Sequence, residues 1–175
     1  MYGQSTAPIN ADIADTTFSY NDAYRDGGGL YSAYLYGTIT LTDVILTDNS
    51  SNYGGGLYLY YLSRLDAVNT QVSRNTAYYA GGGIYVSHSS LFDLADSKVS
   101  GNRARHLYGG GIYGYNASAD YPFRLNRVQI ADNSCLLEGG GVHLSSIATS
   151  TIEECLFEGN EAGAGSFGGG LYTNS

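Results

Sequence analysis

Residues 72–84 read VSRNTAYYAGGGI, and this stretch contains both marks of a repeat that runs through the chain. The first mark is an apolar residue followed three positions later by asparagine, here Val72 and Asn75. The second is a run of three glycines followed by an aliphatic residue, here Gly81 to Ile84. Successive glycine runs start 27, 27, 28, 30 and 29 residues apart. A near-constant period of this size is typical of solenoid proteins.

Both marks occur six times, always in the same order. The copies of the first mark are Phe18/Asn21, Leu46/Asn49, Val72/Asn75, Val99/Asn102, Ile130/Asn133 and Phe157/Asn160. The copies of the second mark span residues 27–30, 54–57, 81–84, 109–112, 139–142 and 168–171. So many aligned copies do not arise by chance, so the chain consists of one repeated structural unit.

The residues between the marks have the pattern of short β-strands. Runs such as Thr38 to Leu41 alternate polar and apolar side chains, which is the two-residue period of a strand with one buried face. A unit of about 27 residues with three short strands cannot bury that face alone, whereas stacked units can. Parallel pairing of equivalent strands requires right-handed crossovers. The sequence therefore predicts an all-β fold, a right-handed parallel β-helix (solenoid) of about six coils of ~27 residues.

The two marks together resemble the repeat of the chlamydial polymorphic outer-membrane proteins. Phe18 to Asn21 and Phe157 to Asn160 match the Phe-x-x-Asn motif of that repeat, and the other four copies have Leu, Val or Ile in place of Phe. Its Gly-Gly-Ala-aliphatic motif has glycine in the third place here, as in residues 81–84. The resemblance implies a β-helix of the pectin-lyase-like class, used in surface-exposed adhesin passengers, and it brings no catalytic residues with it.

Composition argues against several classes of partner. The chain has 16 acidic and 8 basic residues and a formal net charge of −8. Binding to nucleic acid or to an anionic membrane surface needs clustered cations, so both are disfavoured. No apolar run approaches the ~20 residues that span a bilayer, so we expect no direct membrane insertion. Cys135 and Cys155 fall at different points of the repeat, and we expect two free thiols rather than a disulfide or metal site.

The two ends of the sequence are informative about the cellular location of the protein. The first residues show no basic stretch followed by an apolar one, which is the pattern of a signal peptide. Two alternatives remain, a cytosolic protein or a fragment of a longer one. The repeat also stops at Ser175 without a polar capping coil. We therefore expect residues 1–175 to form a single β-helix domain within a longer protein, and the resemblance favours an extracellular or cell-surface location.

The asparagines and glycines of the marks are interpreted as structural. Stacked asparagines tolerate left-handed turns, bond nearby backbone and can form an amide ladder along the solenoid axis. The predicted ladder comprises Asn21, Asn49, Asn75, Asn102, Asn133 and Asn160. A phosphate-binding role for the glycine runs would need a helix N-terminus or a following Lys-Ser/Thr, and neither occurs. We expect the glycines to supply positive φ and close backbone approach at a corner of each coil.

The residue after each aliphatic position is the best candidate for a binding surface. This row comprises Tyr31, Tyr58, Tyr85, Tyr113, His143 and Tyr172. If the aliphatic residues point inward, strand alternation directs the row outward. It could then offer an aromatic platform to sugar rings or to a protein partner. The alternative is a self-stacking ladder that only stabilises the sheet.

Two other groups of residues are candidates for chemical sites. Asp15, Asp43, Asp96 and Glu154 recur at one turn, with Asn69 and Arg127 interrupting the column. Such a column could hold Ca²⁺, but the nonapeptide of calcium-binding β-helices is missing, so a turn-forming role is favoured and no metal site is predicted. The best catalytic cluster, Arg103, Arg105, His106 and Glu138, merely shares a variable loop, and we predict no catalytic residues and no cofactor.

These observations favour a non-catalytic surface scaffold with an adhesion role, whose partner is a glycan or a cell-surface protein. The contact surface would be the tyrosine row or the loop at 117–122. One alternative is a fragment of a carbohydrate-active enzyme such as a polysaccharide lyase or epimerase. Another is a structural spacer rod that associates end to end. Fold analogy does not choose among them.

Overall fold

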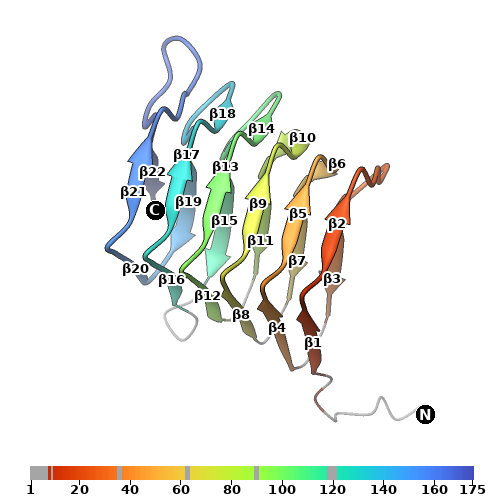
Figure 1. The fold of residues 1–175 in the computed structure, drawn as a ribbon. Helices are drawn as coiled ribbons and strands as arrows, with labels where there is room; N and C mark the ends of the chain where they lie inside the picture. Colours follow the sequence, from red (N-terminus) through yellow and green to blue (C-terminus); the bar gives the residue numbers. More distant parts are fainter. Residues whose placement is uncertain (1–7, 9, 35–36, 62–63, 89–90, 118–121) are drawn as a thin grey trace, which may run out of the picture.

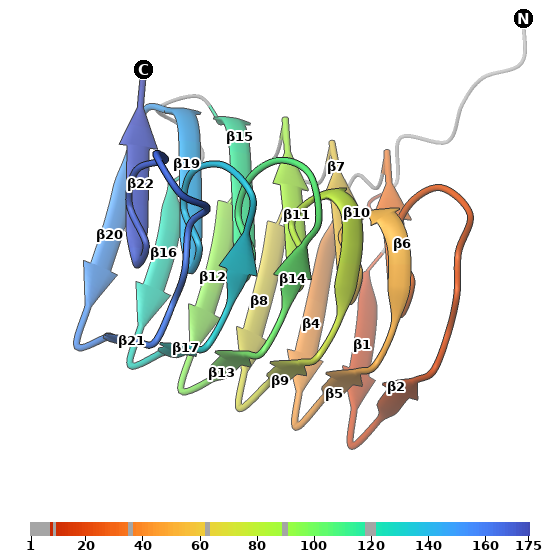
Figure 2. The same cartoon turned by 90° about the horizontal axis from the view of Figure 1, so that it is seen from above.

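The computed structural model describes residues 8, 10–34, 37–61, 64–88, 91–117 and 122–175. Within them the chain winds into stacked coils whose equivalent strands pair in parallel (Figures 1 and 2). The predicted all-β parallel solenoid of about six coils is confirmed. The described residues contain no helix with the length and apolar character needed to cross a membrane.

The strands form four sheets, named here in the order in which each coil passes through them. The first sheet contains β1 (Ala11–Ala14), β4 (Thr38–Thr42), β8 (Arg64–Val68), β12 (Leu91–Ala95), β16 (Phe123–Asn126) and β20 (Ser150–Glu153). The second contains β2 (Thr17–Ser19), β5 (Ile45–Thr47), β9 (Gln71–Ser73), β13 (Lys98–Ser100), β17 (Gln129–Ala131) and β21 (Leu156–Glu158). The third contains β6 (Ser50–Tyr53), β10 (Thr76–Ala80), β14 (Arg103–Ala104) and β18 (Ser134–Cys135). The fourth contains β3 (Leu30–Ala33), β7 (Leu57–Tyr60), β11 (Ile84–Ser87), β15 (Ile112–Ala117), β19 (Val142–Ile147) and β22 (Leu171–Asn174).

The third sheet differs from the sequence-based expectation of three strands per coil. In four successive coils the segment between the asparagine and the glycine run also forms a strand, so these coils have four. Its inward positions hold small side chains, as at Ser51, Ala77 and Ala104, all buried. Because these side chains contribute little to a hydrophobic pattern, the strand is not visible as an alternating run.

The core is a continuous apolar column enclosed by the coils. Equivalent residues pair in register, for example Leu41 with Ala67 and Leu94 with Leu125, and all four are buried. Each fully buried leucine contributes about 1.5–3 kcal/mol relative to an exposed one. The largest core side chains, Phe92 and Phe123, stack across two coils with ring centroids 4.7 Å apart.

Corners between the sheets are made by residues in the left-handed conformation. Each glycine run begins with such a residue, as Gly81 does at φ 64°, and glycine adopts this conformation without a steric penalty. Other corners use residues with side chains, including Asp15, Asp43, Asn69 and Asp96, all at φ between 47° and 55°. Asp15, Asp43 and Asp96 of the acidic column occupy the turn between the first and second sheets, in agreement with the turn-forming role that the sequence favours.

Candidate functional site

The six asparagines lie one above another inside the corner between the second and third sheets. In each step the Oδ1 atom of one asparagine accepts hydrogen bonds from the backbone N–H and the Nδ2 of the asparagine one coil earlier, over 2.9–3.1 Å. From Asn49 onward each Nδ2 also donates to a backbone carbonyl, such as that of Leu46 for Asn75. From Asn49 to Asn133 the side chains are buried and both of their polar atoms are bonded within the protein, so this part of the column offers nothing to a ligand.

The tyrosine row lies on the outer side of the fourth sheet. Strand register places Tyr31 beside Tyr58, Tyr58 beside Tyr85, Tyr85 beside Tyr113, Tyr113 beside His143 and His143 beside Tyr172. The residues on either side of Tyr58, Leu57 and Leu59, are buried in the core. Alternation along the strand therefore directs the row away from the column.

The rings of this row stack on one another. The centroids of Tyr31 and Tyr58 are 5.4 Å apart with an interplanar angle of 5°, and those of Tyr58 and Tyr85 are 4.9 Å apart at 11°. Tyr113 continues the stack at 5.1 Å from Tyr85. Because each ring face is occupied by the next ring, the middle of the row presents ring edges rather than open faces. This geometry favours the ladder interpretation, with about 0.5–1.5 kcal/mol per aromatic pair.

A second set of rings covers part of the row. Tyr53 meets Tyr85 edge to face at 5.4 Å, and Tyr108 lies 6.0 Å from Tyr113 and 4.6 Å from His143. Burial raises the pKa of Tyr58, Tyr85 and Tyr113, that of Tyr85 to about 12. These phenols are therefore neutral throughout the physiological range, and the covered part of the row has no charge with which to bind a ligand.

His143 is the one member of the row that is fully buried, at 2% exposure. It lies between the rings of Tyr113 and Tyr172, under Tyr108, and its Nδ1 is 3.3 Å from the carbonyl oxygen of Glu138. Burial lowers the pKa of His143 below its ordinary value, against a smaller opposing effect of Glu138. The folded protein therefore holds this imidazole neutral.

A pH dependence of stability follows from that burial. Because the pKa of His143 is lower in the folded state, the unfolded chain binds the proton more readily, and stability rises with pH in this range. The contribution is complete above the unfolded value of about 6.5 and is lost as the pH falls below it. We expect urea unfolding midpoints of the wild type to fall between pH 7.5 and pH 5 by more than those of His143→Tyr. If the urea midpoint changed with pH equally in the two proteins, the prediction would be contradicted, because the other groups that titrate between pH 5 and pH 7.5 are the same in both.

Aromatic side chains gather where the strands of the fourth sheet end, and three of them are exposed and two half-buried. This aromatic edge comprises Tyr34, Tyr60, Tyr61, His88 and Tyr115. Tyr34 and Tyr61 are 66% and 48% exposed. Their rings stack at 5.6 Å, Tyr61 stacks on His88 at 5.1 Å, and Tyr60 stands perpendicular to Tyr61 at 4.7 Å. Tyr34, Tyr61 and His88 all have positive φ at this corner, and each lies directly after its strand.

Sequence reasoning did not single out the aromatic edge. The available signal was the Leu-Tyr-Leu-Tyr-Tyr run at 57–61, in which an aromatic residue follows the strand pattern directly. The loop at 117–122, proposed as a contact surface from its length, falls mostly outside the described residues, at 118–121.

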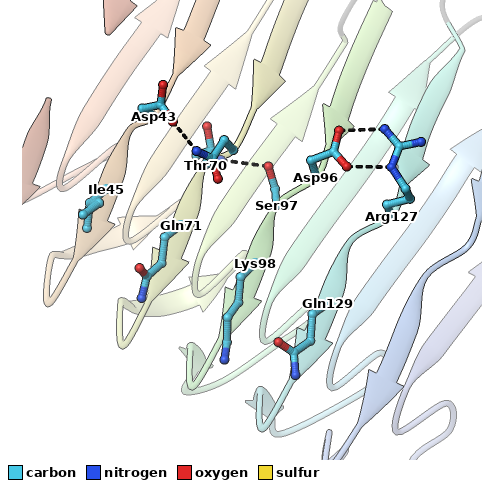
Figure 3. Close-up of a pocket in the computed structure, with 10 residues that line it drawn as sticks. Asp43, Ile45, Thr70, Gln71, Asp96, Ser97, Lys98, Arg127 and Gln129 are labelled. Carbon is cyan, nitrogen blue, oxygen red and sulfur yellow. Dashed lines mark hydrogen bonds and ion pairs between the residues drawn. The ribbon is translucent and has the colours of Figure 1, made fainter. Parts of the chain in front are cut away.

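The acidic turn column borders a shallow groove of about 600 Å³ between the first and second sheets (Figure 3). Gln71, Lys98 and Gln129 project into it side by side from consecutive coils. Asp96 is paired with Arg127 at 2.6 Å, and this guanidinium lowers the pKa of Asp96. Nowhere among the described residues do three His, Cys, Asp or Glu side chains gather as metal ligands would.

The remaining sequence candidates are dispersed. Arg103 and Arg105 lie on the outer face of the third sheet, and His106 rests against Tyr78 with the ring centroids 4.2 Å apart. In the part of the chain that the structure describes, no hydrogen bond or ion pair joins these side chains to the carboxylate of Glu138. Cys135 is a buried free thiol whose Sγ donates to the carbonyl of Leu137, and burial raises its pKa to about 11. Cys155 is also free and lies at the turn between the first and second sheets, whereas Cys135 lies in β18.

Comparison with known proteins gives one result for the chain as a whole. A family model described as "Right handed beta helix region" matches residues 2–175. No curated protein and no solved structure shows a significant match.

Proposed function

Because the chain belongs to the right-handed β-helix family, we propose that it is a non-catalytic surface scaffold that binds a glycan or a cell-surface protein through its aromatic edge. The observation that carries this proposal is the exposure of Tyr34, Tyr61 and Tyr115 in a group on one corner of the solenoid. Their rings lie outside the core cluster. Grouped exposed aromatic surface is a recurring feature of interaction sites.

Tyrosine suits both partners named in the proposal. Its ring supplies a large apolar contact area with two side-chain torsions to order, and its hydroxyl supplies a polar group. The perpendicular contact of Tyr60 with Tyr61 and the stack of Tyr61 on His88 hold these rings in place before a partner arrives. Preorganised side chains lose less entropy on binding, which favours affinity. An adhesion role of this kind would place the protein at the cell surface or outside the cell.

Two carboxylates that are paired with arginine bear on the enzyme alternative. Asp48 accepts hydrogen bonds from Arg74, and Asp96 accepts them from Arg127. These guanidinium groups lower the pKa of both aspartates. A general acid needs a raised pKa near the working pH, so these two carboxylates are unsuited to that role.

The test is a binding measurement on a double variant of the aromatic edge. Tyr34→Ser with Tyr61→Ser removes two exposed rings and leaves the core and the asparagine ladder intact. Against a glycan array and against cells, we expect at least about tenfold weaker binding than for the wild type, equivalent to about 1.4 kcal/mol. Binding measured by surface plasmon resonance on the strongest array hit gives the ratio.

The matched control is Tyr20→Ser, which removes a ring that is 81% exposed at the corner between the second and third sheets. This variant should bind as the wild type does. An unchanged affinity of the folded double variant, or an equal loss in Tyr20→Ser, would remove the aromatic edge from the proposal.

A further inference from the structure

The outer face of the third sheet carries two arginines close together: Arg103 begins β14, and Arg105 directly follows that strand. Arg103 and Arg105 flank Ala104, which is 1% exposed and points into the core. Both arginines are therefore exposed on the same face, about 7 Å apart along the chain. In the described residues the ion pairs of arginine involve Arg64, Arg74 and Arg127, and neither Arg103 nor Arg105 takes part in one.

Two hollows adjoin these arginines and share Arg105. One, of about 340 Å³, is lined by Arg103, Arg105, Ser134 and Glu161 among others. The other, of about 260 Å³, is lined by Arg105, Thr76, Tyr78, Asn52 and Tyr24 among others. Together they form a groove that runs across the coils, here called the third-sheet groove.

Strand register fixes the order of groups along this groove. Thr76 and Ser134 pair with Arg103 from the coils on either side. Tyr78 lies one coil from Arg105, and the residue is 44% exposed. Tyr24, three coils from Arg105, is 92% exposed. The ring of Tyr78 is contacted by His106 at 4.2 Å and edge to face by Tyr79 at 4.8 Å, and the rest of its surface, like that of Tyr24, is open beside hydroxyl and amide groups.

The charges along the groove define what can bind there. Two unpaired guanidinium groups at the centre suit a carboxylate or sulfate, which arginine binds with paired hydrogen bonds. Asp22 lines one end and Glu161 the other. In a protein of net charge −8, these carboxylates repel an anion that extends along the whole groove. The matching ligand therefore has one acidic group with neutral parts on either side.

We propose that the third-sheet groove binds an acidic glycan, with a carboxylate or sulfate group held by Arg103 and Arg105 and a neighbouring neutral sugar packed on Tyr78. Thr76 and Ser134 then lie beside the hydroxyl groups of the bound sugars. The inference deepens the carbohydrate-binding part of the proposed function. It uses a different surface from the aromatic edge, so the two proposals can fail separately.

The experiment compares three oligosaccharides of equal length by isothermal titration calorimetry at low and moderate salt. The first carries one uronate between neutral sugars, the second one sulfate ester at the same place, and the third is the neutral parent. The wild type should bind one or both acidic ligands at least about tenfold more tightly than the parent. The preference between the two identifies carboxylate or sulfate as the natural group. A homopolymer of uronate should bind no better per site than the single uronate.

Variants of exposed residues separate this site from general charge effects. Arg103→Gln and Arg105→Gln should each weaken acidic-ligand binding at least about tenfold, and Arg105→Lys should restore only part of it because lysine cannot pair in the same way. Tyr78→Ser should weaken all three ligands. Lys98→Gln, which removes one exposed positive charge on the second sheet, is the matched control and should bind as the wild type does.

Three results would overturn the proposal. They are equal binding of the neutral parent, wild-type affinity in Arg105→Gln, and an equal loss in Lys98→Gln. The double variant of Tyr34 and Tyr61 should keep its acidic-ligand affinity, so that failure of the aromatic edge is recognised independently.

Discussion

Replacing Asn102 with alanine should lower the free energy of unfolding by about 3 kcal/mol or more. The side chain is 0% exposed. Its Oδ1 accepts from the backbone N–H and the Nδ2 of Asn75, and its Nδ2 donates to the carbonyl of Val72 and to Oδ1 of Asn133. Alanine leaves these buried groups without partners, and each unsatisfied group costs about 1–3 kcal/mol. Because a domain has about 5–15 kcal/mol in total, the loss is a large fraction of its stability.

Urea unfolding followed by far-ultraviolet circular dichroism measures this loss. The matched control is Asn21→Ala, at an exposed asparagine of the same ladder whose side chain donates to Asn49. It should destabilise by about 1 kcal/mol or less, since Asn21 is itself exposed and the Oδ1 of Asn49 keeps its hydrogen bond from the backbone N–H of residue 21. A loss at Asn102 as small as that at Asn21 would show that the buried ladder does not stabilise the coils.

The ladder was predictable from the sequence because it depends on periodicity alone. When the coils stack, an asparagine at one position of every repeat lies above its equivalents, and this does not depend on which residues occupy the surface. The right-handed β-helix was predictable for the same reason, because the fold follows from the two repeated marks. The family match to residues 2–175 confirms it. The third-sheet strand, which four successive coils contain, is not predicted from the sequence because Ala77 and Ala104 give no alternating hydrophobic signal.

The candidate sites depend on side-chain contacts between different sheets, which the repeat period does not predict. Alternation predicts that Tyr85 points outward, but not that Tyr53, from the preceding coil and another sheet, packs edge to face against its ring. The open rings of Tyr24 and Tyr78 and the unpaired Arg105 share a groove only because the third sheet exists. A reading of the repeat without that strand places Arg103 and Arg105 in a loop, where no surface is defined for them.

Replacing Gly82 with alanine is the second change with a large expected effect. The added Cβ would meet the carbonyl oxygen of Gly110 and, at 2.5 and 2.6 Å, the backbone carbon and nitrogen of Arg103. These are backbone atoms of the next coil, which cannot move aside as a flexible side chain can. Relief requires the coils to separate, which breaks the hydrogen bond from the N–H of Gly82 to the carbonyl of Gly109, at 3.1 Å. We expect a loss of about 3 kcal/mol or more in the free energy of unfolding.

Gly101→Ala is the control that separates crowding from backbone conformation. Gly101 has φ 64°, so alanine there adopts a left-handed conformation, but its Cβ would have no neighbour closer than 3.7 Å. That conformation alone costs roughly 1–2 kcal/mol. Gly82 lacks positive φ. The larger loss in the free energy of unfolding expected for Gly82→Ala therefore results from the close approach of the neighbouring coil. If Gly101→Ala destabilised the protein as much as Gly82→Ala, close approach of neighbouring coils would not be the reason for glycine in the middle of the run, and backbone conformation alone would have to account for it.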